Sequence, residues 1–386
     1  MTLDVDIDPD DISTNPSGGP SFDEVVERRA SRRTVLAGGM AGAAAFLTTN
    51  LVGSSPALAK GSSRVSAAEL LGFSPIPLGY SDEVVVPPGY TARAFIPWGT
   101  PLTGSYPAFV PGGNTASEQE QQVGMHHDGM HYYPIDRGPA GNRHGLLVVN
   151  HEYTDESYLQ TGTSTAPPKT SWTPGMVARS QAAHGVSVVE VKEEAAGEWS
   201  VVRSTKNRRI TANTPMSVTG PAAGHRLLKT SADPQGQTIL GTINNCSHGV
   251  TPWNTYLTCE ENFNGYFRLD PGAYTAEQQN LANRYGVGGD RFNWATHDAR
   301  FVVSPEEPNE PNRFGWVVEI DPFDPHSRPI KRTALGRTKH ESSYVHVAKG
   351  GRVVVYTGDD QVNEHVYKFV SRDNDGAQLN LASSTH

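Results

Sequence analysis

The 386-residue sequence is poor in cysteine and in positive charge, and each shortage argues against a class of protein. Its two cysteines, Cys246 and Cys259, are too few to staple a disulfide-rich scaffold. The formal net charge is −9, and no basic stripe or nucleic-acid motif is present. These features argue against nucleic acid as a partner and are compatible with cation binding. The sequence also lacks G-x-S-x-G, P-loop and dinucleotide-binding motifs.

Long hydrophobic runs are scarce too, and the clearest local signal lies near the N-terminus. The pair Arg32-Arg33 precedes a Gly/Ala-rich run, AGGMAGAAAFL, and Ala57-Leu58-Ala59 follows as an A-x-A cleavage site. This pattern is typical of a bacterial Tat export leader, and the alternative is a membrane anchor. We predict that residues 1–59 are removed on export through the Tat translocase, which leaves no stable membrane anchor. The mature protein is then periplasmic or extracellular, and folded export favours a bound metal or organic cofactor.

Glycine and proline are abundant, at 39 and 28 residues, and favour a loop-rich β protein over a helical bundle. Short apolar runs bounded by Gly, Pro, Asn and Asp predict strands at 83–87, 92–96, 145–150, 186–191, 255–259, 300–304, 315–320, 344–348, 352–358 and 366–370. The best helical pattern falls at 273–285, and the segments 101–124 and 154–185 are expected to be long loops. The predicted fold class is all-β, as a sandwich, barrel or propeller with a few short helices.

A faint repeat favours the propeller. The segments 146–156, 255–265 and 352–364 each run through apolar residues and finish in acids. Two further segments, 185–202 and 315–332, have the pattern of strand–turn–strand hairpins. Acid-ended strands that alternate with hairpins match the blades of a β-propeller, whose inner strands line a central channel. The alternative is an irregular sandwich with acidic loops.

The first candidate site is Cys259-Glu260-Glu261 at the end of an expected strand. Adjacent buried acids need neutralisation, and a cation neutralises several at once. Carboxylates suit Ca²⁺, whereas a thiolate prefers Fe, Zn or Cu, so the mixture indicates a transition metal or two unlike metals. In regular strand geometry Cys259 and Glu261 share a face that Glu260 does not. The alternative is a buried structural cysteine beside solvated acids.

Other clusters add candidate residues. Asn150, His151 and Glu152 end one expected strand, and Asp359-Asp360 ends another, although surface pairs and ordinary turns give the same patterns. Arg337, Lys339, His340 and Glu341 follow in a further segment, where arginine and lysine suit a phosphoryl group and a solvated basic loop is the alternative. The run 125–133 holds three histidines and an aspartate, which fit either a Zn or Fe site or a structural turn; these residues are His126, His127, Asp128 and His131. Cys246 either pairs with Cys259 or stays free.

These motifs together resemble the PhoX alkaline phosphatases. The resemblance rests on NNCSHGVTPWNTYLTCEENFNGYF, MHHDGMHYYP, LLVVNHEYTDE, GRTKHESSYVHVAKGGRVVVYTGDD and the twin-arginine leader, and it runs from about residue 70 to the end. It implies a Tat-exported β-propeller over residues 60–386, with Fe³⁺ and Ca²⁺ at the channel mouth and phosphate monoesters as substrates. We expect the protein to be a monomer. Family members run well beyond 386 residues, so we expect the propeller to lack C-terminal blades.

The resemblance also assigns roles to residues. It implies that Cys259 ligates iron and that acids ligate iron or calcium, namely Glu260 or Glu261, Glu152, Glu341, and Asp359 or Asp360. Arg337, with Lys339, would hold the phosphate, and Asn150 would be a further polar contact. The function predicted is a secreted, metal-dependent phosphomonoesterase. The alternatives are a calcium-dependent propeller esterase or lactonase, and a non-catalytic binding propeller stabilised by calcium.

Overall fold

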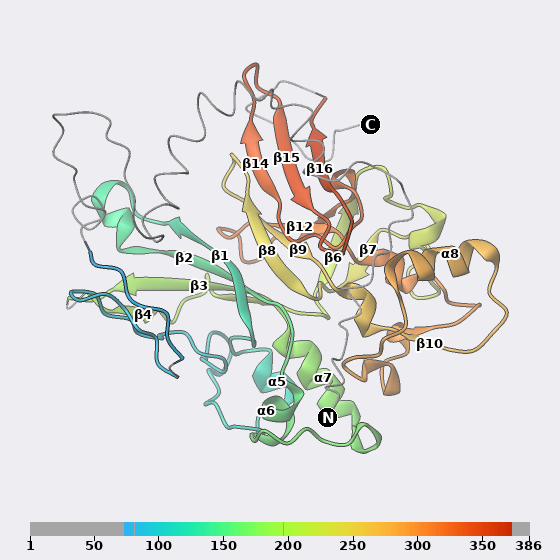
Figure 1. Cartoon of the computed structure of the whole chain (residues 1–386), viewed down its shortest axis with the longest axis horizontal. Coiled ribbons are helices and arrows are strands. Elements are labelled where there is room, and N and C mark those ends of the chain that lie inside the picture. Colours follow the sequence, from blue (N-terminus) through green and yellow to red (C-terminus); the bar gives the residue numbers. More distant parts are fainter. Residues whose placement is uncertain (1–72, 81, 196, 373–386) are drawn as a thin grey trace, which may run out of the picture. The chain divides into compact units, whose positions relative to one another are not determined.

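The computed structural model describes residues 73–80, 82–195 and 197–372 (Figure 1). These residues fall into two units, 73–95 and Ile96 to residue 372. The expected leader, 1–59, lies outside the described residues, so its removal stays a prediction. Every helix in the described part of the chain is too short or too polar to span a bilayer.

The first unit forms no helix or strand in its described residues. The strands expected at 83–87 and 92–96 are therefore wrong. Pro87 and Pro88 lack the N–H that a sheet ladder requires, and Tyr90 donates its N–H to the carbonyl of Pro87 at 3.0 Å to close a turn instead. The ring of Phe73 meets the edge of Tyr90 at 5.8 Å.

The second unit begins with a sheet in the order β1-β2-β3-β4, in which β5 also pairs with β3 (Figure 1). Its strands are β1 (His127–Pro134), β2 (His144–His151), β3 (Gly185–Glu193), β4 (Trp199–Val201) and β5 (Arg208–Ile210). The predicted hairpin at 185–202 is confirmed, because β3 and β4 pair antiparallel. Successive side chains of β2 alternate between two cores, Leu146 in one and Leu147 against the other, as a strand buried on both faces requires.

A larger sheet follows in the order β7-β6-β13-β12-β9-β8. Its strands are β6 (Pro215–Thr219), β7 (Thr238–Leu240), β8 (Asn245–Val250), β9 (Tyr256–Glu260), β12 (Val317–Ile320) and β13 (Ile330–Arg332). The hairpin predicted at 315–332 is confirmed as β12 and β13. Tyr256 and Val318 of this sheet share a core with Val148 of the first sheet, so the two sheets pack through apolar side chains.

The third sheet is the antiparallel series β14 (Tyr344–Val347), β15 (Val353–Gly358) and β16 (Val366–Val370). Val353 and Val355 of β15 pack against Leu257 of β9, which joins this sheet to the second one. A short parallel pair, β10 (Arg268–Leu269) and β11 (Val302–Val303), replaces the strand expected at 300–304.

Four α-helices lie in the described residues: α5 (Ala116–Gln119), α6 (Glu156–Thr161), α7 (Pro174–Ala183) and α8 (Ala276–Tyr285). The helix expected at 273–285 is confirmed as α8, which begins at a Thr275–Gln278 capping box. The expected loop 154–185 is wrong, because Asp155 and Thr173 cap α6 and α7. The expected loop 101–124 holds the single turn α5.

The three sheets meet at strand β8. This strand, at one edge of the second sheet, contacts β1 and β2 of the first sheet and β14 of the third (Figure 1). The all-β class with long loops and a few short helices is confirmed. Within the described residues each sheet is an open series and none closes on itself. The ends of the gathered strands hold the candidate site.

Candidate metal centre

Three antiparallel strand pairs, one from each large sheet, end in the same way. The last paired residues are His127 with His151, Asn245 with Glu260, and His340 with Asp359. The residue that follows each of these six is an acid or a cysteine: Asp128 and Glu152, Cys246 and Glu261, Glu341 and Asp360. The site therefore consists of three equivalent pairs of candidate ligands. The acid-ended repeat in the sequence supplies one ligand of each pair, namely Glu152, Glu261 and Asp360.

The same backbone contact holds each pair. Glu152 donates its N–H to His126 at 3.1 Å and Glu261 donates to Asn244 at 3.0 Å. Asp360 donates to Lys339 at 2.9 Å. The accepting carbonyl lies in each case two residues before the other candidate ligand of the pair, which is Asp128, Cys246 or Glu341. His126 and Asn244 reach this position with positive φ angles of 44° and 49°, an uncommon conformation outside glycine that recurs at functional sites.

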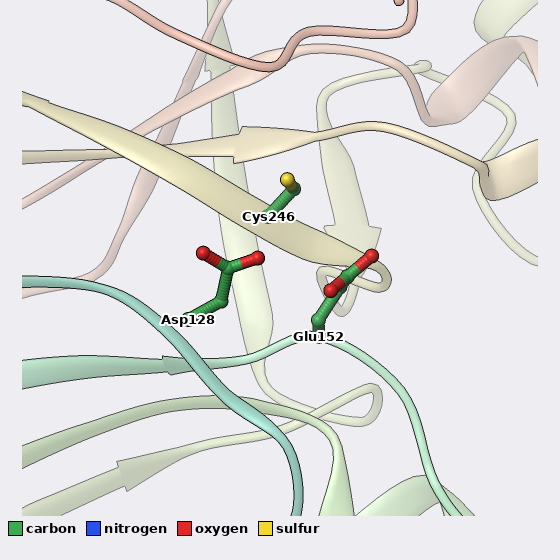
Figure 2. Close-up of side chains that lie close together, drawn as sticks. All are labelled: Asp128, Glu152 and Cys246. Carbon is green, nitrogen blue, oxygen red and sulfur yellow. The ribbon is translucent and has the colours of Figure 1, made fainter. Parts of the chain in front are cut away.

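Asp128, Glu152 and Cys246 lie close together, as Figure 2 shows. One ligand atom from each, two carboxylate oxygens and the sulfur, lie within 4.8 Å of one another. Donor atoms on opposite sides of a metal are about 4–5 Å apart, since metal–ligand bonds are about 2.0–2.6 Å long. These three side chains therefore have the spacing and chemistry of a cation site with a sulfur donor.

The other three acids adjoin this group. Glu261 and Glu341 both lie within hydrogen-bonding reach of the Asp360 carboxyl. The Cys246 thiol is 3.8 Å from Oε1 of Glu341, which links the two halves of the cluster. Glu261 and Cys246 are buried, whereas Glu341 and Asp360 are exposed. The cluster thus runs from a buried floor to an exposed rim.

Crowding of like charges shows in the pKa values. Burial, and then hydrogen bonding to Asp128, raises the pKa of Glu152 to about 7. Burial, and then the charge of Glu152, raises the pKa of Glu261 to about 9. Burial, and then Asp360, raises the pKa of Glu341 to about 7, and burial with the charge of Glu261 raises the pKa of Cys246. A cation would reverse these shifts by favouring the ionised groups, so the donor set fits bound metal.

Cys259, expected as the iron ligand, occupies a different environment. It is fully buried and packs in the apolar cluster of Leu257, Val317, Val353 and other residues behind the site. Strand alternation places it with Leu257 in that core, and Cys246 of the adjacent strand supplies the sulfur among the acids. Both cysteines are free thiols, so the alternative of a disulfide between them is wrong.

Two of the acids proposed as alternatives are also placed elsewhere. Glu260 is fully buried and forms a 2.6 Å ion pair with Lys331. It also accepts a hydrogen bond from the backbone N–H of Trp316 at 3.1 Å. Asp359 accepts the N–H of Lys339 at 3.0 Å and lies 3.6 Å from Arg284. In both pairs it is therefore the second acid, Glu261 or Asp360, that joins the cluster.

Asn150 is a buried cross-link, and the structure does not expose it to a substrate. Its Nδ2 donates to the carbonyls of Cys246 at 2.6 Å and Ser247 at 3.0 Å. Its Oδ1 accepts from the hydroxyls of Tyr256 at 3.0 Å and Thr258 at 2.9 Å. The expected polar contact to substrate is corrected to a structural role, because both amide atoms are already used in tying β2 to β8 and β9.

Arg337 and Lys339 do not line the cluster as expected. Arg337 donates from Nε and Nη2 to the carbonyls of Phe314 at 2.8 Å and Pro311 at 2.7 Å, and its guanidinium lies over the rings of Phe263 and Tyr285. Lys339 is buried, with Nζ 2.5 Å from Oε1 of Gln361. The phosphate-binding role predicted for these two residues is therefore corrected to a role in packing the loop before β14.

Sequence reasoning left Asp128 and Cys246 without a role in the cluster. Of the residues in the run 125–133, Asp128 joins the cluster, while His126 stacks on Tyr153 at 3.8 Å and His127 packs edge-on to His151. A signal was available in the sequence. Aligning His126-His127-Asp128, Asn244-Asn245-Cys246 and Lys339-His340-Glu341 gives one repeat of a polar or basic pair followed by a ligand.

The three sheets and the thiol–carboxylate cluster at their meeting ends define a β protein with a candidate metal centre. Residues 71–384 match the family model described as alkaline phosphatase PhoX, and the chain belongs to this family. It is also similar to the solved structure of Pseudomonas fluorescens PhoX in complex with vanadate, a transition state analogue, with 45% identity and a TM-score of 0.71.

That similarity covers 78% of this chain and 51% of the other, so the chain spans about half the length of the protein it matches. Comparison with curated proteins gives no match. The family expected from the sequence motifs is confirmed, and with it the β-propeller class, whose sheets do not close within the described residues.

Proposed function

We propose that the chain is a metal-dependent phosphomonoesterase that uses Fe³⁺ and Ca²⁺. The observation that carries the proposal is the convergence of five carboxyl groups and one thiol from three equivalent strand pairs. PhoX membership and the vanadate-bound relative support phosphate monoesters as the substrates.

The donor chemistry supports two kinds of metal. Cys246 with Asp128 and Glu152 combines one sulfur and carboxylate oxygens, which suits iron. Glu261, Glu341 and Asp360 offer oxygen alone, which suits calcium. Glu341 lies beside both Cys246 and Asp360, so it would adjoin both sets of donors.

When bound, such metals supply Lewis-acid polarisation of a phosphoryl oxygen. The residues of the chain hold the metal ligands in position. At each paired strand end a backbone hydrogen bond fixes one ligand of the pair against the neighbouring strand, so the ligands need little reorganisation when charge develops on the phosphoryl group. The exposed rim at Glu341 and Asp360 leaves an open side by which an ester can approach.

We also propose that the protein is exported through the Tat translocase and acts as a monomer in the periplasm or outside the cell. The support is the twin-arginine leader before the matched family region. Replacing Arg32 and Arg33 together by lysine should retain the protein inside the cell. Normal export of that variant would contradict the Tat assignment.

The test of the phosphomonoesterase is a comparison of Cys246→Ala with Cys259→Ala. Purified wild type, loaded with metals during folding, is analysed for iron and calcium and assayed on an aryl phosphate. We expect Cys246→Ala to lose iron and nearly all turnover, and Cys259→Ala to keep both with a stability loss of about 1 kcal/mol.

Retained iron and normal turnover in Cys246→Ala would overturn the assigned metal centre. A wild type that binds calcium without iron and hydrolyses lactones but no phosphate esters would instead indicate the calcium-dependent esterase.

A further inference from the structure

Arg291 lies beside the cluster on a backbone fixed to it. Its N–H donates to the carbonyl of Gly265 at 2.7 Å, and the preceding residue, Asp290, donates to Phe267 at 3.1 Å. Gly265 belongs to the short turn that follows Glu261. The backbone of Arg291 is thus held close to the buried floor of the site, although its side chain is exposed.

Aromatic rings set the direction of the Arg291 side chain. Its guanidinium carbon lies 5.4 Å from the ring centroids of both Tyr153 and Phe292. Tyr153 directly follows Glu152, and the ring of His126 stacks on it. Aromatic rings hold the planar guanidinium of an arginine in place, so the side chain loses little conformational entropy when it binds a ligand. The ring of Tyr153 belongs to the strand end that carries Glu152.

The charge of Arg291 is available for a ligand. Within the described residues, no carboxylate lies within ion-pair distance of its guanidinium, and its side-chain contacts are the two rings. Other cations near the site are engaged, Lys331 by Glu260 and Arg284 by Asp359 and Glu364. The contact of Arg291 with Tyr153, the residue after Glu152, places the guanidinium beside the strand end that carries this candidate ligand.

We propose that Arg291 binds the non-bridging oxygens of the phosphoryl group of a substrate held at the cluster. This inference rests on the proposed function, and it replaces Arg337 by a different arginine in the phosphate-binding role. The reason is electrostatic. An anionic ester must approach a cluster of carboxylates, and a guanidinium beside the strand end that carries Glu152 offers paired donors with the geometry of a phosphoryl group.

The experiment compares Arg291→Ala and Arg291→Lys with Arg143→Ala, a control at an exposed arginine just before β2. Binding of inorganic phosphate to the metal-loaded proteins is measured by calorimetry, with iron and calcium analysed in parallel. We expect Arg291→Ala to bind phosphate about ten- to a hundredfold more weakly, with unchanged metal content, because a charge-assisted contact is lost. Arg291→Lys should fall between, and Arg143→Ala should match wild type.

Kinetics separate this role from a structural one. Arg291→Ala should raise KM for an aryl phosphate and the inhibition constant for phosphate together, with the same thermal unfolding as wild type. Unchanged phosphate affinity, or loss of iron and calcium along with it, overturns the assignment. A wild type that binds phosphate but hydrolyses no ester refutes the proposed function alone, and the variant comparison still decides the role of Arg291. A wild type that binds no phosphate overturns both.

Discussion

Glu261 donates its backbone N–H to the carbonyl of Asn244 at 3.0 Å, and this contact sets Glu261 beside Cys246 on the neighbouring strand. The equivalent contacts of Glu152 and Asp360 do the same in the other two sheets. A ligand set built in this way depends on strand register, since a shift by one residue turns a side chain to the opposite face. The two acids in TCEE therefore have different roles, which mutations can separate.

Replacing Glu261 by glutamine should weaken metal binding without destabilising the metal-free fold. The side chain belongs to a crowded group of carboxyls, so loss of one charge relieves repulsion. Metal affinity should fall by more than the about 10–100-fold that loss of an outer-shell partner costs. Metal titration and thermal unfolding of the metal-free protein measure the two effects.

Glu260→Gln is the matched variant at the adjacent residue. It leaves the buried ammonium of Lys331 without its 2.6 Å partner, so we expect the free energy of unfolding to fall by about 3–5 kcal/mol. If both variants lost metal equally while stability stayed normal, the separation of roles between the two acids would be wrong.

The apolar runs of the sequence predict most of the strands, because β2, β3 and β9 are rich in apolar residues and bury both faces. The sequence did not predict the helices between 154 and 185, because their hydrophobic periodicity is weak. Their start signals, Asp155 and Thr173, are also common in turns. Local pattern thus predicts elements that carry their own apolar face, and misses short capped helices.

The site was predicted in its chemistry and only partly in its residues. The acid pairs in TCEE and GDD each hold one cluster member, and the choice between neighbours depends on the residue at which strand pairing stops. The choice of Cys246 over Cys259 depends on the bulge between Asn245 and His248, where the register of β8 against β9 shifts. Pairing of this kind is a long-range property that a single strand does not encode.

Asn150→Ala should damage both stability and metal binding. The amide makes four hydrogen bonds in a fully buried position, and its removal leaves the carbonyls of Cys246 and Ser247 without those donors. An unsatisfied buried group costs about 1–3 kcal/mol, so we expect a loss of at least that size in urea unfolding. Asn283→Ala, on helix α8, is the control. Normal stability with altered KM alone would instead restore the substrate contact first expected for Asn150.

Gly129→Ala tests how closely β1 must approach β8. An added Cβ would lie 2.9 Å from the carbonyl oxygen of Cys246 and 3.0 Å from Nδ2 of Asn150, so backbone or a buried amide would have to move. Because Gly129 directly follows the ligand Asp128 in β1, we expect weaker iron binding with the fold retained. Gly175→Ala, whose Cβ would meet its nearest neighbour at 3.8 Å, should behave as wild type. Iron affinity, measured by competition with a chelator, distinguishes the two variants. Equal affinities would show that β1 and β8 can move apart enough to accept the added Cβ.

His144 should make stability depend on pH far from the metal centre. Hydrogen bonds to Glu190 at 2.8 Å and Asp136 at 2.9 Å raise its pKa, and Lys206 is the other charge that pairs with Glu190. A pKa raised by folding stabilises the protein fully below the unfolded value of about 6.5 and loses that contribution as pH rises through the folded value. The advantage of wild type over His144→Gln in unfolding free energy should therefore be greatest near pH 6, at no more than about 1 kcal/mol, and should shrink above neutrality. His326→Gln, at an exposed position in the turn between β12 and β13, controls for loss of a surface histidine. An advantage that grew with pH would mean that the neutral imidazole, and not the charged one, is the form that the two carboxylates stabilise.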